Sequence, residues 1–252
     1  MIRKVDLNAD MGEGFGPWGM GDDLALLDIV TSANIACGFH AGDPDIMAQT
    51  MQAAVARGVG IGAHPGFADL KGFGRRPLPL SHAEIANAVA YQLGAAQAMA
   101  RRAGGHLRQF KLHGALSNMA SSDADLARSC FQAALAVDPD IVILVLAATA
   151  MEEAARELDC HWAGEIFADR AYEDDATLVS RAKPGAVLRD AGTAAARILA
   201  MLEAGAIIAE SGKCIPCRID TICLHGDTPD AVAMAQGIRT RLTKAGVTLK
   251  SL

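Results

Sequence analysis

Seven short runs of β character alternate with helical patterns along the chain, and this alternation constrains the fold more than any other feature. The β runs cover residues 4–10, 32–39, 58–64, 107–113, 140–147, 162–169 and 219–225. Helical patterns are expected at 43–58, 81–105, 121–137, 149–159, 189–205 and 228–246, and a small hairpin at 206–218. Strands that alternate with helices build a parallel sheet.

The length of 252 residues and the number of strand–helix units predict the architecture. We expect an α/β fold in which the strands close into a TIM-like (β/α)7 barrel, regular or distorted. An open, doubly wound sheet is the alternative. No linker, low-complexity tract or break in composition divides the chain, so a single domain is predicted over residues 1–252.

Charge and hydropathy exclude several classes of function. The net charge is −6 and no basic run occurs, which argues against a nucleic-acid surface. No stretch approaches ~18 uninterrupted apolar residues and no leader-like segment occurs at the start, so a soluble, cytoplasmic protein is expected. The six cysteines are widely spread, and Cys214-Ile-Pro-Cys217 lacks a second ligand pair, so reduced thiols are favoured over a disulfide framework or a zinc site.

Four of the seven histidines fall at the predicted ends of strands. A glycine or proline follows each of them within two residues, where the backbone has to turn. In parallel α/β folds the catalytic groups gather at the carboxyl ends of the strands. One such histidine would be unremarkable, but four at equivalent places indicate a functional set, namely His40, His64, His113 and His225.

Charged residues occupy the same strand ends. Asp6, Asn8 and Asp10 alternate along the first strand and therefore share one face, which in a barrel is the interior. An unpaired charge is costly there, so these residues need partners or a function. The other charged residues at strand ends are Glu13 in the following turn, Lys111 two residues before His113, and Glu165, Asp169 and Arg170 around the sixth strand end.

Two turns share one plan: "CGFHAGDPDIM" and "CLHGDTPDAV" each pass from a strand through histidine, glycine and aspartate to a helix. Asp43 and Asp227 are expected either to cap those helices or to border an anion-binding turn. Arg75 and Arg76 in "GFGRRPL" either bind an anion or remain solvated. The GxGxxG match at 14–19 contains a proline, and neither a Walker A nor a GxSxG motif occurs, so any nucleotide is held in another way.

Six segments together resemble the signature blocks of the LamB/YcsF family. They are "DLNADMGEGFG", "ANIACGFHAGDP", "GIGAHPGFADLKGFGRR", "KLHGALSN", "EIFADRAY" and "DTICLHGDTP", in the expected order from Asp6 to Pro229. Ala9 replaces a usual cysteine, and Leu112 and Ser117 replace a usual proline and tyrosine. Ala9 is expected to point away from the face of Asn8 and Asp10, whereas Ser117 bears on substrate contacts.

The resemblance implies a TIM-like barrel related to glycoside hydrolases and deacetylases. It also implies ATP-dependent opening of the lactam 5-oxo-L-proline to L-glutamate by an ATP-hydrolysing 5-oxoprolinase. The implied cofactor is ATP, with Mg²⁺ as a further candidate, and the implied partners are 5-oxoprolinase subunits B and C. A homo-oligomer is left open.

Lactam activation requires cations, carboxylates and a base, which leads to a hypothesis for each group. The expected catalytic set is Asp10, Glu13, His40, His64, Lys111, His113, Asp169 and His225. The expected substrate-binding set is Asn8, Asp43, Arg75, Arg76, Asn118, Glu165, Arg170 and Asp227. A metal, if present, would be held by candidates among Asp10, His40, His64 and His113. A metal-dependent amidohydrolase or deacetylase without ATP, and a non-catalytic, substrate-binding component of a complex, remain alternatives.

Overall fold

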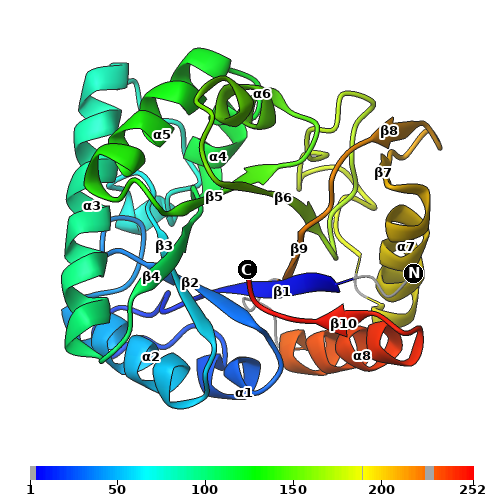
Figure 1. The fold of residues 1–252 in the computed structure, drawn as a ribbon, viewed down its shortest axis with the longest axis horizontal. Coiled ribbons are helices and arrows are strands. Elements are labelled where there is room, and N and C mark those ends of the chain that lie inside the picture. Colours follow the sequence, from blue (N-terminus) through cyan, green and yellow to red (C-terminus); the bar gives the residue numbers. More distant parts are fainter. Residues whose placement is uncertain (1–3, 189, 225–229) are drawn as a thin grey trace.

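Parallel strands form the central sheet of the computed structural model, which describes residues 4–188, 190–224 and 230–252. The strands are β1 (Lys4–Met11), β2 (Ser32–Ala36), β3 (Gly60–His64), β4 (Leu107–Phe110), β5 (Val142–Leu146), β6 (Trp162–Phe167), β9 (Thr221–Leu224) and β10 (Thr248–Leu249). Pairing runs in order from β1 to β6, and β9 pairs with both β6 and β1. The sheet therefore closes into a barrel, and β10 lies outside the ring beside the start of β1 (Figure 1).

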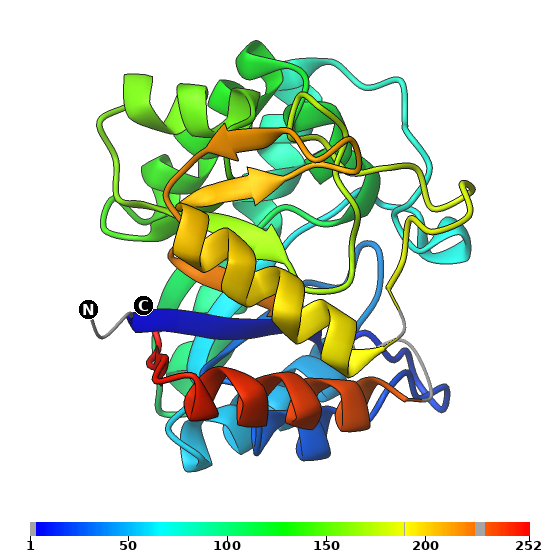
Figure 2. The same cartoon turned by 90° about the vertical axis from the view of Figure 1, so that its right-hand side faces the viewer.

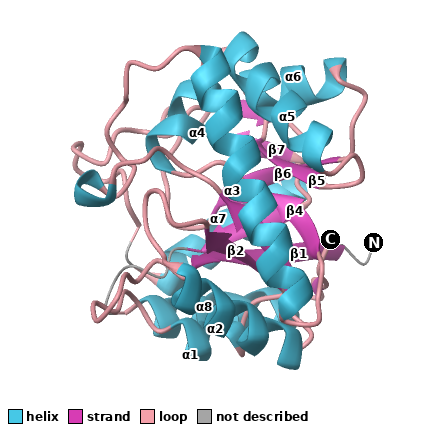
Figure 3. Ribbon diagram, turned by 90° about the vertical axis from the view of Figure 1, so that its left-hand side faces the viewer, coloured by secondary structure: helices cyan, strands magenta, loops and turns pink. Residues whose placement is uncertain are grey.

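Helices surround this barrel (Figure 3). They are α1 (Asp23–Leu27), α2 (Pro44–Ala56), the 3-10 turn η1 (Leu70–Gly72), α3 (His82–Arg102), α4 (Gly114–Ala120), α5 (Ala124–Val137), α6 (Ala150–Glu157), α7 (Ala191–Ala204) and α8 (Ala231–Lys244). The antiparallel hairpin of β7 (Ala206–Ile208) and β8 (Cys214–Pro216) lies beside α7 (Figure 2). No helix among the described residues is long and apolar enough to cross a membrane.

Side-chain chemistry fixes the helix boundaries. The Asp43 carboxylate accepts hydrogen bonds from the backbone N–H groups of Asp45 and Ile46 at the start of α2. Ser81 and Glu84 form the expected capping box at the start of α3. Gly205 ends α7 in the left-handed conformation, with φ of 61°. These local signals place both ends of the helices close to the predicted positions.

The two faces of β1 have opposite character. Leu7 and Met11 face outward, where they join the apolar layer between strands and helices. Asp6, Asn8 and Asp10 face the interior, as the alternation predicts. Barrels of this kind usually fill their interior with branched apolar side chains, so a polar interior is a departure that needs hydrogen-bond partners on the other strands.

Those partners come from the neighbouring strands. The Asp6 carboxylate accepts hydrogen bonds from the hydroxyls of Thr31 and Ser32, each at 2.7 Å, and of Thr221 at 2.5 Å. One step along the axis, Asn8 donates to Glu165 at 3.0 Å and to Thr221 at 2.6 Å. The interior is thus a column of hydrogen-bonded polar groups that leads toward the carboxyl ends of the strands, in which the Oε1 atom of Gln109 has no partner among the described residues.

The sequence predicted the closed parallel barrel and the hairpin correctly, whereas the open sheet is excluded by the β1–β9 pairing. Several strands end earlier than predicted: β2 stops at Ala36, β4 at Phe110 and β6 at Phe167. The residues after these ends are loops that carry the polar side chains described below. Four short elements, α1, η1, α4 and β10, were not predicted, because their lengths are too small for periodicity to show.

Candidate active site

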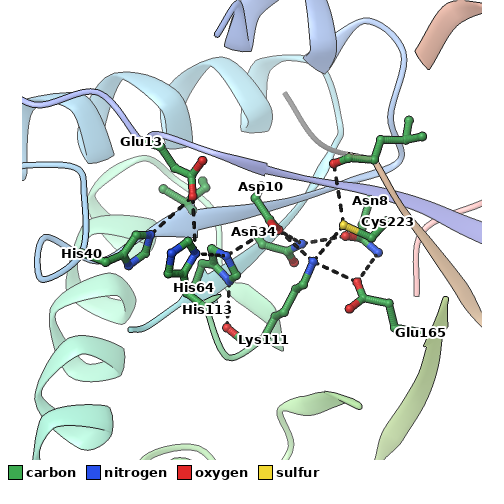
Figure 4. A network of polar contacts seen from close by, with 12 residues as sticks. Asn8, Asp10, Glu13, Asn34, His40, His64, Lys111, His113, Glu165 and Cys223 are labelled. Carbon is green, nitrogen blue, oxygen red and sulfur yellow. Dashed lines mark hydrogen bonds and ion pairs between the residues drawn. The ribbon is translucent and has the colours of Figure 1, made fainter. Parts of the chain in front are cut away.

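Three histidines meet at the carboxyl end of the barrel. His64 is the last residue of β3, His113 lies just beyond β4 at the start of α4, and His40 lies in the loop between β2 and α2 (Figure 4). The rings of His40 and His113 stack nearly parallel with their centroids 3.6 Å apart, and His64 is nearly perpendicular to both. All three side chains are buried.

A tight loop after η1 holds these rings in place. Phe73 and Gly74 both have positive φ, 54° and 59°. A Cβ atom on Gly74 would lie 2.7 Å from Cβ of His40 and 2.9 Å from Cδ2 of His113. Glycine is therefore required at position 74 for two reasons, the backbone conformation and the close approach to the imidazoles.

Hydrogen bonds to carbonyl oxygens define the tautomers of two rings. Nδ1 of His64 lies 2.9 Å from the carbonyl oxygen of Lys111, and Nε2 of His113 lies 2.8 Å from that of Phe73. A carbonyl only accepts, so these two nitrogens carry the protons. Burial, followed by the nearby imidazoles, lowers the pKa of His113 far below its usual value, and burial also lowers the pKa of His40. The His40 and His113 rings are therefore neutral at physiological pH.

Carboxylates flank the imidazoles on one side. Oε1 of Glu13 lies 3.4 Å from Nε2 of His40 and 3.6 Å from Nδ1 of His113. Oδ2 of Asp10 lies 3.3 Å from Nε2 of His64. One ligand atom from each of Glu13 and the three histidines falls within 4.8 Å of the others, a donor set of the size and chemistry that a metal ion requires.

Lys111 joins the cluster to the polar column. Its Nζ lies 2.9 Å from Oδ1 of Asp10, 3.0 Å from Oε1 of Glu165 and 3.0 Å from Sγ of Cys223. Burial opposes the charge of Lys111, but the surrounding Asp10, Cys223 and Glu165 raise its pKa well above the usual value. Burial raises the pKa of Glu165, an effect that Lys111 partly counteracts. The balance of these effects favours the charged form of Lys111 inside the barrel.

A pocket of about 560 Å³ opens above Lys111 and the histidines. Its charged lining consists of two acidic and four basic residues: Asp10, Glu13, Arg75, Lys111, Arg170 and Arg181. The formal charge of this lining is therefore positive, in a chain whose net charge is −6. Such a pocket attracts small anions.

The structure brings most of the predicted site residues together. Those that line the pocket are Asp10, Glu13, His64, Arg75, Lys111, His113, Asn118 and Arg170. Asn8, His40 and Glu165 are buried directly behind it, and Asp169 is buried beside Arg170. His225 and Asp227 lie outside the described residues.

Two predicted substrate ligands have other roles. Asp43 caps α2 and also accepts a hydrogen bond from the Gly16 N–H at 2.7 Å, so its carboxylate is engaged away from the pocket. The Arg76 side chain is 64% exposed and forms an ion pair with Asp69 instead of lining the pocket. Of the two arginines expected as substrate ligands, only Arg75 lines the pocket, so Arg76 is withdrawn from that set.

Sequence reasoning missed one wall of the pocket. Residues 177–181, in the long connection after β6, line it together with Ser121 and Ser122. The connection between β6 and α7 has no periodic pattern, and only its length and the basic Arg181 distinguish it in the sequence. Its contribution depends on how it folds back: Leu178 forms a bridge with Tyr172, and Arg170 with Val187.

Comparisons with known proteins agree with this architecture. The sequence pattern of the LamB/YcsF family matches residues 5–252. A relative from Ruegeria pomeroyi, named as the A subunit of 5-oxoprolinase, is 63% identical over 248 residues, covering 98% of each chain. One of the same name from Gluconobacter oxydans is 50% identical over 250 residues, covering 99% of this chain and 98% of the relative.

Solved structures show the same fold. A lactam utilization protein from Thermus thermophilus superposes with a TM-score of 0.92 at 41% identity, covering 99% of this chain and all of the other. The catalytic domain of a peptidoglycan N-acetylglucosamine deacetylase from Eubacterium rectale superposes with a TM-score of 0.52 at 11% identity, covering 99% of this chain and 88% of that domain. The second likeness concerns the fold alone.

Proposed function

Because the chain belongs to the LamB/YcsF family, we propose that it binds 5-oxo-L-proline and opens its lactam ring to L-glutamate, as one component of an ATP-dependent enzyme that also contains subunits B and C. The names of its relatives support this role. The observation that carries it is the pocket itself, in which basic groups for an anion adjoin carboxylates and imidazoles suited to proton transfer.

The substrate carboxylate has a matching group in the pocket. Arg170 is 6% exposed, and its Nη2 donates to the carbonyl oxygen of Val179 at 2.6 Å. Its Nε has no hydrogen-bond partner among the described residues. A buried guanidinium N–H without a partner is costly, and a bound carboxylate would satisfy it. Arg75, whose Cζ lies 4.9 Å from the Phe73 ring centroid, supplies a second cation at the pocket wall.

The proposed chemistry follows from the stability of the amide. Resonance makes the lactam carbon a poor electrophile, so transfer of the ATP γ-phosphoryl group to the lactam oxygen would activate it. Water then adds to that carbon, and the C–N bond breaks as the ring nitrogen takes a proton, which leaves the acyl phosphate of glutamate. A second water hydrolyses this acyl phosphate to L-glutamate and phosphate. Lys111 would stabilise negative charge that develops on the oxygen, and Asp10 or Glu13 would accept the proton of the attacking water.

The test is glutamate formation by the chain reconstituted with subunits B and C, with 5-oxoproline and ATP supplied. We expect turnover only when ATP is present. Arg75→Ala should raise KM for 5-oxoproline about tenfold or more, since a charge-assisted hydrogen bond is worth roughly 1.5–3 kcal/mol. The matched control Arg76→Ala removes an arginine outside the pocket and should leave KM within about twofold. Absence of glutamate from the complete complex would refute the proposal.

The donor set of Glu13 and the three histidines also favours a second candidate, metal-dependent hydrolysis of an amide without ATP. The same assay separates the two, because that activity persists when ATP is omitted. Assaying the chain alone distinguishes catalysis by this component from a role limited to substrate binding.

A further inference from the structure

The close contact between the His64 and His113 rings has no proton to form a hydrogen bond when both rings are neutral. Nε2 of His64 and Nδ1 of His113 are 3.0 Å apart. The opposite nitrogen of each ring donates to a carbonyl oxygen, Lys111 for His64 and Phe73 for His113. In neutral rings both facing nitrogens therefore carry lone pairs, and two lone pairs at this distance repel one another unless a cation lies between them or beside them.

The ring nitrogens of His40 also lack hydrogen-bond partners. Its side chain is fully buried, and neither ring nitrogen has a hydrogen-bond partner within the described part of the chain. Nε2 lies 3.4 Å from Oε1 of Glu13, in a direction that does not form a hydrogen bond. A shared proton between His64 and His113 would relieve only their contact and would leave His40 unsatisfied.

One metal ion accounts for both features. We propose that Nε2 of His64, Nδ1 of His113, Nε2 of His40 and the Glu13 carboxylate bind a divalent transition-metal ion at the floor of the pocket. A tetrahedral ion with ~2.05 Å bonds to nitrogen separates its ligand atoms by about 3.3 Å. Three of the six separations among these atoms, 3.0, 3.4 and 3.6 Å, bracket that value, and all six lie within 4.8 Å.

Two of the proposed histidine ligands already have the outer contacts of a metal site. The carbonyl oxygens of Lys111 and Phe73 fix the tautomers of His64 and His113, as second-sphere groups do for metal-bound histidines. The stacked rings of His40 and His113 hold their lone pairs in separate planes, so His40 has to tilt away from His113 to complete the site. Loss of this stacking is a structural consequence of metal binding.

The donor set also selects the metal. Imidazole ligands suit zinc, iron, nickel, copper and cobalt, whereas magnesium and calcium prefer sets composed of oxygen. Three imidazoles and one carboxylate therefore favour Zn²⁺ or a neighbouring first-row ion over Mg²⁺ in this position. Any Mg²⁺ that accompanies ATP would bind elsewhere. The site adds a metal to the pocket of the proposed function, and with Glu13 bound to that metal, Asp10 accepts the proton of the attacking water. The test measures binding rather than turnover, so the two proposals can fail separately.

The experiment uses the full chain, treated with chelator, loaded with Zn²⁺ or Co²⁺ and freed of excess metal. We expect about one equivalent of retained metal by mass spectrometry, ligand-field bands from the Co²⁺ form, and a rise in Tm of roughly 5 °C or more with saturating Zn²⁺. Glu13→Gln, nearly identical in shape, should weaken binding at least tenfold, and His64→Gln should abolish the bands.

Matched controls are His106→Gln and His161→Gln, which alter exposed histidines, and Cys214→Ser, which alters an exposed thiol. All three should retain the metal of the unmodified chain. Circular dichroism of each metal-free variant establishes that it folds, and Glu13→Gln decides the matter if His64→Gln does not. Retention of less than roughly a tenth of an equivalent by the unmodified chain, or undiminished binding in folded Glu13→Gln, would overturn the proposal.

Discussion

Replacing Lys111 with methionine tests whether the buried charge network holds the barrel together. The substitution removes the ammonium but keeps an unbranched side chain of similar length, so little packing is lost. Nζ lies 2.9 Å from Asp10 and 3.0 Å from Glu165. The side chains of Lys111 and Glu165 are 5% and 4% exposed, so water would replace the lost partner only poorly.

The expected cost is about 3–5 kcal/mol in the free energy of unfolding, the usual effect of removing one partner from a buried ion pair. Domains are stable by only about 5–15 kcal/mol, so the variant should remain folded with a small margin. With a urea m-value of about 2–3 kcal/mol/M, the denaturation midpoint should fall by roughly 1–2 M.

The cost should depend on pH in a defined direction. Burial raises the pKa of Glu165 in the folded chain, and Lys111 counteracts this. Without Lys111 the folded pKa rises further above the unfolded value, so the folded state binds the proton more tightly. The destabilisation is then complete above the folded pKa and decreases as the pH falls through it. We expect a larger loss at pH 8 than at pH 5.

Urea unfolding of three variants at both pH values provides the measurement. Lys71→Met, which alters an exposed lysine, is the matched control and should change stability by less than about 0.5 kcal/mol. Adding Glu165→Gln to Lys111→Met removes a stranded carboxylate and should recover part of the loss. A cost below about 1 kcal/mol that is equal at both pH values would show that the network contributes little to stability.

Two further substitutions test local features of the site. Gly74→Ala should lower the free energy of unfolding by at least about 2 kcal/mol, since it combines positive φ with a contact at 2.7 Å. Gly104→Ala, with φ of 82° and no atom within 4 Å of the added Cβ, should lose only the backbone part of about 1 kcal/mol. A loss no greater for Gly74→Ala than for Gly104→Ala in urea unfolding would contradict the close approach to His40. Asp43→Ala should cost about 1 kcal/mol through loss of the α2 cap while KM for 5-oxoproline stays unchanged; an increased KM would return Asp43 to the pocket.

The sequence predicted the barrel and the centre of the site because both depend on local patterns. Periodicity located the strands, and the strand-end rule selected His40, His64 and His113 although they are distant from one another in the chain. The alternation of Asp6, Asn8 and Asp10 likewise predicted which face of β1 points into the barrel.

What the sequence could not supply depends on contacts between distant segments. Asn34, Gln109 and Thr221 are ordinary polar residues in their own strands, and only the register of the closed barrel makes them partners in the interior. Arg75 and Arg76 are adjacent, and the position of Asp69 decides that only Arg76 turns away from the pocket. The tautomers of His64 and His113 also depend on which carbonyl oxygen faces each ring, and no local sequence pattern predicts those contacts.

The pairing of β1 with both β9 and β10 has a consequence for biosynthesis. β1 is synthesised long before two of its partners, β9 and β10, which begin at Thr221 and Thr248. Until then both β1 and β6 present an unpaired edge, which is a template for association with other chains. Folding should therefore be slow for a chain of this size, because ring closure joins strands that are far apart in the sequence, and incomplete chains should be prone to association through these open edges.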